Sequence, residues 1–134
     1  MGWIFAQAMH ELLGQCRLVW VVSASQSSAQ KMGQHFGCRY GTQLNQALAD
    51  PAVDAVVIAA STPAHAELAI ACAKAGKPFF VEKPIADTLE NGRRMVRAAE
   101  ESAVPNMVGF HRRYDPAYAQ AWSLLARTLG VTET

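Results

Sequence analysis

The sequence has few cysteines, little net charge and no long apolar run, and each shortage excludes a class of protein. Cys16, Cys38 and Cys72 lie far apart, without the spacing of a zinc site or a disulfide framework. A formal net charge of +1 gives no electrostatic support for nucleic-acid binding. No apolar stretch approaches the ~18 residues of a membrane span, and no signal peptide is recognisable. We therefore expect a protein of the reducing cytoplasm, with Cys38 and Cys72 as buried thiols.

What is present is the alternating pattern of an α/β domain. The 134 residues, 51% hydrophobic and 17% charged, are typical of one globular domain. Short apolar runs predict strands at 18–22, 37–41, 55–59, 79–81 and 105–108. Helical periodicity and capping residues predict helices at 5–13, about 26–36, 42–49, 62–76, 89–102 and 116–129. This alternation favours a parallel sheet with right-handed crossovers and helices on both faces.

Capping residues support several of these helix boundaries. Thr42 and Thr88 are predicted N-caps, and Thr62-Pro63 is predicted to place a threonine at the N-cap and a proline at the first helical position. Asp115-Pro116 is predicted to open the last helix, and Gly76 to follow the end of the helix before it.

The stretch 76–85 is the most informative one. The apolar run Phe79 to Val81 stops abruptly at Glu82-Lys83-Pro84, so these polar residues are predicted at the carboxyl end of a buried strand. Ligands bind at that edge in open parallel sheets. Lys83 is the one residue of the run that could donate a proton near neutral pH once buried. The alternative is a strand that simply ends in a surface ion pair.

Three stretches together resemble one known family. They are residues 49–65, with the sequence ADPAVDAVVIAASTPAH, the tripeptide Glu82-Lys83-Pro84, and residues 109–116, with the sequence GFHRRYDP. In this order, and on these elements, they resemble the nucleotide-binding half of the Gfo/Idh/MocA oxidoreductases. The segment Arg-Arg-Tyr-Asp-Pro is similar to that of inositol dehydrogenases in particular.

The resemblance implies a Rossmann-like domain that transfers hydride between NAD or NADP and a CH–OH group of a sugar or polyol, with myo-inositol among the candidates. It implies that Lys83 contacts the reacting hydroxyl as the catalytic residue, that Glu82 orients the site, and that Pro84 shapes the turn through a cis bond. The implied cofactor-binding residues are Gly2, Ile4, Phe5, Ser23, Ala60, Ser61, Thr62, Pro63, His65, Glu82, Lys83, Pro84 and Arg112. The implied substrate-side residues are Lys83, His111, Arg113 and Tyr114, and no metal is implied.

Simpler interpretations of these residues remain open. His65 is equally consistent with a helix-surface histidine. Arg112 and Arg113 are also consistent with a solvated pair of basic residues.

The N-terminal segment departs from the family pattern. Gly2 takes the place of the second glycine of the phosphate-binding motif, Phe5 replaces the third, and His10 matches a histidine of the family. The first glycine and the strand before it are absent, although the family needs glycines there for close approach to the pyrophosphate. Without that strand, strands 18–22 and 55–59 must pair directly or leave two bare apolar edges. We therefore expect weak NAD(P) binding or none.

A second departure concerns the cofactor. The acid that usually binds the ribose hydroxyls is missing after strand 18–22, where Ser23-Ala24-Ser25 stands instead. Serines tolerate a 2′-phosphate, so this position favours NADP over NAD.

The chain is expected to be one incomplete domain, 1–134, without the substrate domain that carries further catalytic residues in the family. On its own it is expected to be inactive, and a homo-oligomer is expected only of the full-length enzyme. We expect the sequence before Met1 to encode an apolar strand ending in Gly-x-Gly, and that after Thr134 to encode the substrate domain. The competing hypothesis is a non-catalytic binding or assembly fragment that has lost cofactor binding.

Overall fold

The computed structural model describes residues 1–12 and 14–129. The strands are β1 (Trp20–Val22), β2 (Arg39–Gly41), β3 (Val56–Ile58), β4 (Phe79–Val81) and β5 (Asn106–Val108). The α-helices are α1 (Gly2–Glu11), α2 (Gln26–Phe36), α3 (Leu44–Leu48), α4 (Thr62–Lys74), α5 (Leu89–Ser102) and α6 (Pro116–Leu129). A short 3₁₀ helix, η1 (His111–Tyr114), precedes α6. The predicted α/β class and the alternating order of elements are therefore confirmed, although η1 was not predicted.

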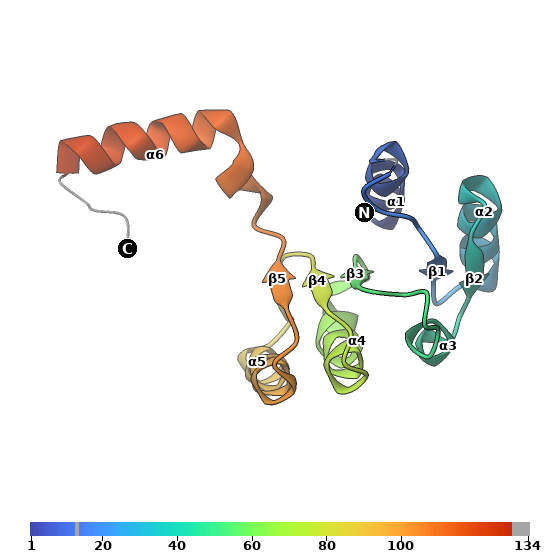
Figure 1. The fold of residues 1–134 in the computed structure, drawn as a ribbon. Helices are drawn as coiled ribbons and strands as arrows, with labels where there is room; N and C mark the ends of the chain where they lie inside the picture. The colour runs from blue at the N-terminus through green and yellow to red at the C-terminus, as the bar shows by residue number, and fades with distance from the viewer. Residues whose placement is uncertain (13, 130–134) are drawn as a thin grey trace.

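All paired strands are parallel, but they form two sheets rather than one. β1 pairs with β2, and β3, β4 and β5 pair in that order. The strands lie in one row, β5-β4-β3-β1-β2, with a gap between β3 and β1 (Figure 1). This is the doubly wound order 3-2-1-4-5-6 without its first strand. Among the described residues no strand fills that position, so of the two alternatives that the sequence left open, direct pairing or bare edges, the structure has the bare edges.

The hydrogen bonds identify the backbone groups that face the gap. Arg39 N donates to Val19 O, and Ser23 N donates to Gly41 O, so the odd-numbered residues of β1 pair with β2. The backbone groups of Trp20 and Val22 therefore point toward β3. On the other side, residues 56 and 58 of β3 pair with β4, which leaves the backbone of residue 57 facing β1.

Helices cover both faces of the row of strands, as predicted. α1 and α2 lie on one side, and α3, α4 and α5 lie on the other (Figure 1). The core between α4, α5 and the three-stranded sheet is built around Cys72, Val81 and Met95, which are almost fully buried. Burial raises the pKa of the Cys72 thiol to about 11, and it also raises the pKa of the half-buried Cys38 thiol.

Capping residues account for the start of α5 and correct two predictions. α5 begins after Thr88, whose hydroxyl accepts a hydrogen bond from Asn91 N, as predicted. Gly76 follows α4 with φ 68°, a left-handed conformation that glycine adopts without steric cost. The predicted N-cap Thr62 was wrong, because Ser61 holds the extended N-cap conformation and Pro63 falls within the first helical turn.

The second correction concerns α3. It begins at Leu44 after an extended Gln43, so Thr42 is not its N-cap. Thr42 lies instead in the bend where the chain leaves β2.

A polar bracket joins the two sheets at the amino ends of their strands. The buried Asp50 carboxylate accepts a hydrogen bond from Trp20 Nε1 at 2.6 Å and pairs with Arg39 at 2.6 Å. Lys77, just before β4, donates to Val53 O at 2.6 Å. The Trp20 indole N–H, the Ala52 amide and the Arg39 guanidinium together lower the pKa of Asp50 below its ordinary value. The bracket is thus an ion pair and hydrogen-bond network that links β1 and β2 to the segment that leads into β3.

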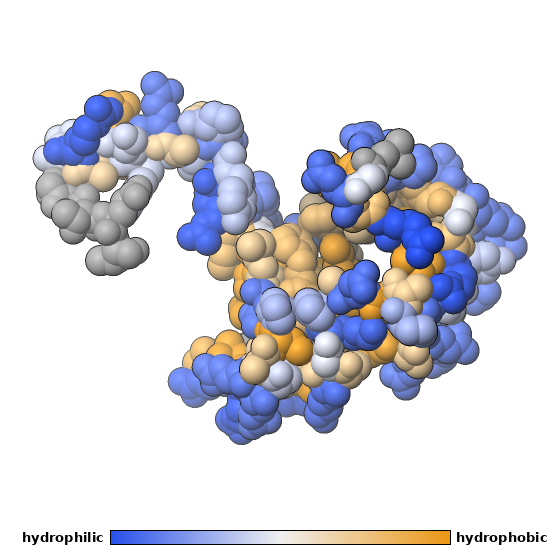
Figure 2. All heavy atoms as spheres, in the orientation of Figure 1, coloured by the Kyte–Doolittle hydropathy of each residue, from blue (hydrophilic) through white to orange (hydrophobic). Residues whose placement is uncertain are grey.

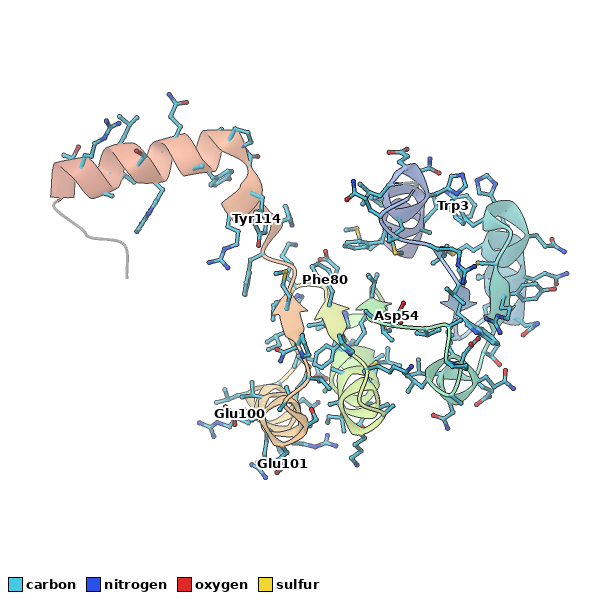
Figure 3. All side chains as sticks on the ribbon, in the orientation of Figure 1. Trp3, Asp54, Phe80, Glu100, Glu101 and Tyr114 are labelled. Carbon is cyan, nitrogen blue, oxygen red and sulfur yellow. The ribbon has the colours of Figure 1, made fainter. Side chains whose placement is uncertain are left out.

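Aromatic contacts attach α1 to both halves of the molecule. Trp3 packs between α1 and α2, with ring centroids 4.9 Å from His35 and 5.2 Å from Phe36 (Figure 3). Phe5 lies 5.4 Å from the ring of Phe80 on β4. The predicted end of this helix at Leu13 lies outside the described residues.

α6 contacts η1 and extends away from the sheets (Figure 1). Its large apolar side chains Tyr118, Trp122, Leu124 and Leu125 are exposed. Apolar atoms also gather over the centre of the molecule, where β3, β4 and β5 lie (Figure 2). Within the described part of the chain, no helix combines the length and apolarity needed to cross a membrane.

Candidate functional site

The candidate site lies at the carboxyl ends of β3 and β4, where two turns follow neighbouring parallel strands. The first turn, Ala60-Ser61, leads into α4, and the second is Glu82-Lys83-Pro84. The two strand ends are bonded to each other, because Glu82 N donates to Ile58 O at 2.9 Å. The structure therefore brings together the predicted site residues of these two turns.

Glu82 is a buried carboxylate that supports the second turn. Only 6% of the residue is exposed, and its Oε2 accepts a hydrogen bond from the Lys83 backbone N–H at 3.1 Å. The peptide bond between Lys83 and Pro84 is cis, as the family resemblance implied. Glu82 thus holds the backbone of Lys83 rather than its ammonium group.

Lys83 itself is exposed at the open edge of the sheet. Among the described residues its ammonium group takes part in no ion pair, so the alternative of a strand ending in a surface ion pair is not what the structure contains. The burial that would favour proton donation is also absent in this chain. An exposed lysine at this edge remains free to contact a ligand.

His65 is buried beneath both turns and is not the helix-surface histidine of the simpler interpretation. It is 1% exposed in the first turn of α4. Its Nδ1 lies 2.9 Å from Pro84 O, and its Nε2 lies 3.1 Å from Ala60 O. The ring therefore bridges the two turns and does not face open space.

Gly109 closes the site on the side of β5. A Cβ added to this residue would lie 2.7 Å from Phe80 Cζ and 3.1 Å from Glu82 Oε1. A larger residue at this position would therefore force the side chains of Phe80 and Glu82 to move. Gly109 lies in the segment 109–116 that resembles the family, but the sequence assigned it no role. The packing of Phe80 and Glu82 against it could not be inferred from residue spacing.

Among the described residues, no side-chain hydrogen bond or ion pair joins the residues of η1 to this cluster. His111, Arg113 and Tyr114 are exposed, and Tyr114 is 67% exposed. Arg112 Nη1 donates to Tyr118 Oη at 2.7 Å, and its guanidinium lies over the Tyr118 ring. Figure 3 shows Tyr114 at the start of the segment that leaves the sheets.

The predicted residues of the phosphate end are spread over the other half of the molecule. Gly2 begins α1, and nothing lies within 4 Å of a Cβ added to it. Ile4 is 63% exposed, and Phe5 packs on Phe80. Ser23 follows β1, where its hydroxyl lies 3.4 Å from Ser25 N.

One groove lies away from the predicted residues. A groove of about 450 Å³ runs along α5 and is lined by Ile85, Leu89, Gly92, Arg93, Val96, Arg97 and Glu100. Within the described residues, no group of three or more His, Cys, Asp or Glu side chains could hold a metal ion.

The family model of the Gfo/Idh/MocA oxidoreductases, described as an oxidoreductase family with an NAD-binding Rossmann fold, matches residues 1–110. The chain is 33% identical over 122 residues to scyllo-inositol 2-dehydrogenase (NAD(+)) of Bacillus subtilis (strain 168), covering 90% of this chain and 36% of that enzyme.

Two solved structures are also similar. GenD2 from gentamicin A biosynthesis, in complex with NAD, has a TM-score of 0.86 and 31% identity over 94% of this chain and 36% of that one. The WlbA dehydrogenase of Bordetella pertussis, in complex with NADH and UDP-GlcNAcA, has a TM-score of 0.88 and 26% identity over 94% of this chain and 39% of that one.

The chain spans little more than a third of the length of these proteins. This chain belongs to the Gfo/Idh/MocA family of oxidoreductases with an NAD-binding Rossmann fold.

Proposed function

We propose that this chain is the nucleotide-binding half of an NAD(P)-dependent oxidoreductase that acts on a CH–OH group of a sugar or polyol. The observation that carries the proposal is the paired arrangement of the Ala60-Ser61 and Glu82-Lys83-Pro84 turns, which presents Lys83 at the edge where such sheets bind ligands. The name of the Bacillus subtilis relative puts inositols among the candidate substrates.

The residues fit a dinucleotide at one end better than at the other. The turns that follow β3 and β4 are joined to each other by hydrogen bonds and form one edge of the site. At the phosphate end, α1 offers Gly2, but the position between β1 and β3 holds no strand of the described residues. We therefore propose that the chain alone binds NAD(P) weakly, and that a strand in that position would complete the site.

The chemistry can be assigned to this chain's own residues. Bound NAD(P)⁺ would supply the acceptor for hydride from the carbon that bears the hydroxyl. Lys83 would hold the hydroxyl oxygen and take part in moving its proton, while Glu82 keeps the Lys83 backbone in place. Because Lys83 is exposed here, its proton transfer would depend on a substrate domain that closes over it and excludes water.

We also propose that the complete enzyme accepts NADP as well as NAD. Ser23 and Ser25 lie between β1 and α2, Ser27 lies in the first turn of α2, and none of them brings a carboxylate that would repel a 2′-phosphate. The complete enzyme is proposed to form a homo-oligomer in the cytoplasm, where three free cysteines would stay reduced.

A second candidate function rests on the unpaired edges. The facing edges of β1 and β3 carry backbone groups that pair with no strand of the described residues, and such edges recruit strands from other chains. A non-catalytic assembly fragment would use them in this way without binding NAD(P).

Turnover in a protein completed with a first strand and a substrate domain tests the proposal. Such a protein should reduce NAD⁺ or NADP⁺ with a polyol, myo-inositol included. Lys83→Ala should lower kcat by about 10²–10⁴-fold with little change in KM for the cofactor. Lys74→Ala, at the exposed end of α4, is the matched control and should leave kcat unchanged. Full activity of Lys83→Ala would make Lys83 a structural residue, and absence of any turnover would favour the assembly fragment.

A further inference from the structure

We infer that His65 is a positioning residue that fastens the two turns of the candidate site to each other, and so fixes where Lys83 stands. Its consequence for catalysis rests on the proposed function, but the contacts themselves do not. The family resemblance placed His65 only along the cofactor cleft, and the structure gives it a different task.

The geometry of the bridge is specific. Ala60 follows β3 and lies 5 residues before His65, whereas Pro84 follows β4 and lies 19 residues after it. The imidazole ring stands between their carbonyl oxygens, with one ring nitrogen within hydrogen-bond distance of each. At 1% exposure, water has little access to replace either contact.

The chemistry of these partners limits what the ring can do. A carbonyl oxygen only accepts hydrogen bonds, so a ring nitrogen needs an N–H to bond to it. The neutral ring carries one N–H, which satisfies one contact, and a ring that carries two satisfies both. A side chain without N–H groups would leave two carbonyl oxygens facing an apolar, water-poor space, which is costly.

The bridge restrains Lys83 from its carboxyl side. Lys83 is bonded directly to Pro84, whose carbonyl His65 holds. On its amino side, the Lys83 backbone N–H is held by the Glu82 carboxylate. The lysine backbone is therefore fixed between two buried side chains, although its own side chain is exposed. His65 relates this fixed point to the Ala60 turn, the other wall of the site.

Two substitutions separate positioning from simple filling of space. The amide nitrogen of asparagine falls near the position of His Nδ1, so His65→Asn retains the contact with Pro84 and loses that with Ala60. The amide nitrogen of glutamine falls near Nε2, so His65→Gln retains the contact with Ala60 and loses that with Pro84. Glutamine is also the closer match in volume, so a space-filling role predicts the opposite ranking.

Backbone amide exchange in the 134-residue chain tests the inference. The Lys83 amide should exchange about tenfold faster in His65→Gln than in the unmodified chain, the effect of losing one hydrogen bond, and within about twofold in His65→Asn. The amide of Ala69, buried in the middle of α4, is the internal control and should change equally in both variants. Equal effects at Lys83, or slower exchange in His65→Gln than in His65→Asn, would overturn the inference.

The unmodified chain supplies a test if the variants do not fold. Nitrogen-15 spectra of the His65 ring should show a slowly exchanging proton on Nδ1, the nitrogen with the shorter contact. A ring whose N–H protons all exchange as fast as those of the exposed His10 would overturn the inference. None of these readouts uses cofactor or substrate, so failure of NAD(P) binding would remove the proposed function and leave this result standing.

Discussion

Gly109→Ala should destabilise the chain through a clash that the structure locates. The added Cβ would lie 2.7 Å from Phe80 Cζ, whereas ordinary contact begins at 3.4 Å. The ring tip must therefore retreat by about 0.7 Å, and the Phe5 ring packed against Phe80 limits that movement. Glu82 Oε1, at 3.1 Å, must also give way. Overpacking of this kind costs about 1–3 kcal/mol, which would lower Tm by several degrees.

The assay is urea unfolding followed by tryptophan fluorescence. Gly92→Ala is the matched control, because it lies inside α5 and a Cβ there would find its nearest neighbour, Ala86 Cβ, at 3.9 Å. It should stabilise the chain by about 0.5–1 kcal/mol, the usual gain of alanine over glycine in a helix. Phe80→Leu removes the clashing ring tip, so Gly109→Ala should cost clearly less in that background. An equal cost in both backgrounds would refute the packing argument, as would no cost at all.

Two further outcomes follow from titratable groups. Hydrogen bonding, led by Trp20, lowers the pKa of Asp50 in the folded state below its unfolded value, near 3.8. The stability that the Asp50 carboxylate contributes is therefore present above the unfolded pKa, and it is lost as the pH falls through the folded-state pKa. Urea unfolding at several pH values between about 5 and 2 should therefore show a smaller loss of unfolding free energy in Asp50→Asn than in the unmodified chain. Identical pH profiles of the two proteins would contradict a stabilising role of the Asp50 network. Burial raises the pKa of the Cys72 thiol to about 11, so at pH 8 Cys72 should react with iodoacetamide roughly a hundredfold more slowly than the exposed Cys16. Equal labelling rates of the two thiols, measured by mass spectrometry, would contradict the burial of Cys72.

The sequence predicts the elements well because their signals are local. The helix at 89–102 has the predicted bounds, since Thr88 caps it and its apolar positions follow helical spacing. The strands lie inside the predicted apolar runs, each shorter than or equal to its run. The gap between β1 and β3 was one of two alternatives that the sequence left open, the other being direct pairing of these strands.

The sequence could not predict contacts between residues that only the fold brings together. Asp50 directly follows the predicted helix 42–49, yet its carboxylate accepts a hydrogen bond from Trp20, 30 residues away. His65 and Pro84 are 19 residues apart, and no spacing rule indicates that a ring nitrogen of one meets the carbonyl of the other. The N-caps of α3 and α4 were misplaced by one residue, because several adjacent polar residues could serve as caps and tertiary packing selects among them.

A calorimetric titration of NADH and NADPH into two forms of the chain tests the proposed cofactor-binding function most directly. One form is the present chain, and the other carries an added N-terminal apolar strand ending in Gly-x-Gly, designed to pair with β1 and β3. We expect binding weaker than about 1 mM for the first form, near −4 kcal/mol, and micromolar binding for the second, near −8 kcal/mol. NADPH should bind at least as tightly as NADH. Failure of the extended chain to bind either dinucleotide, while it folds, would contradict the claim that this is a cofactor-binding half.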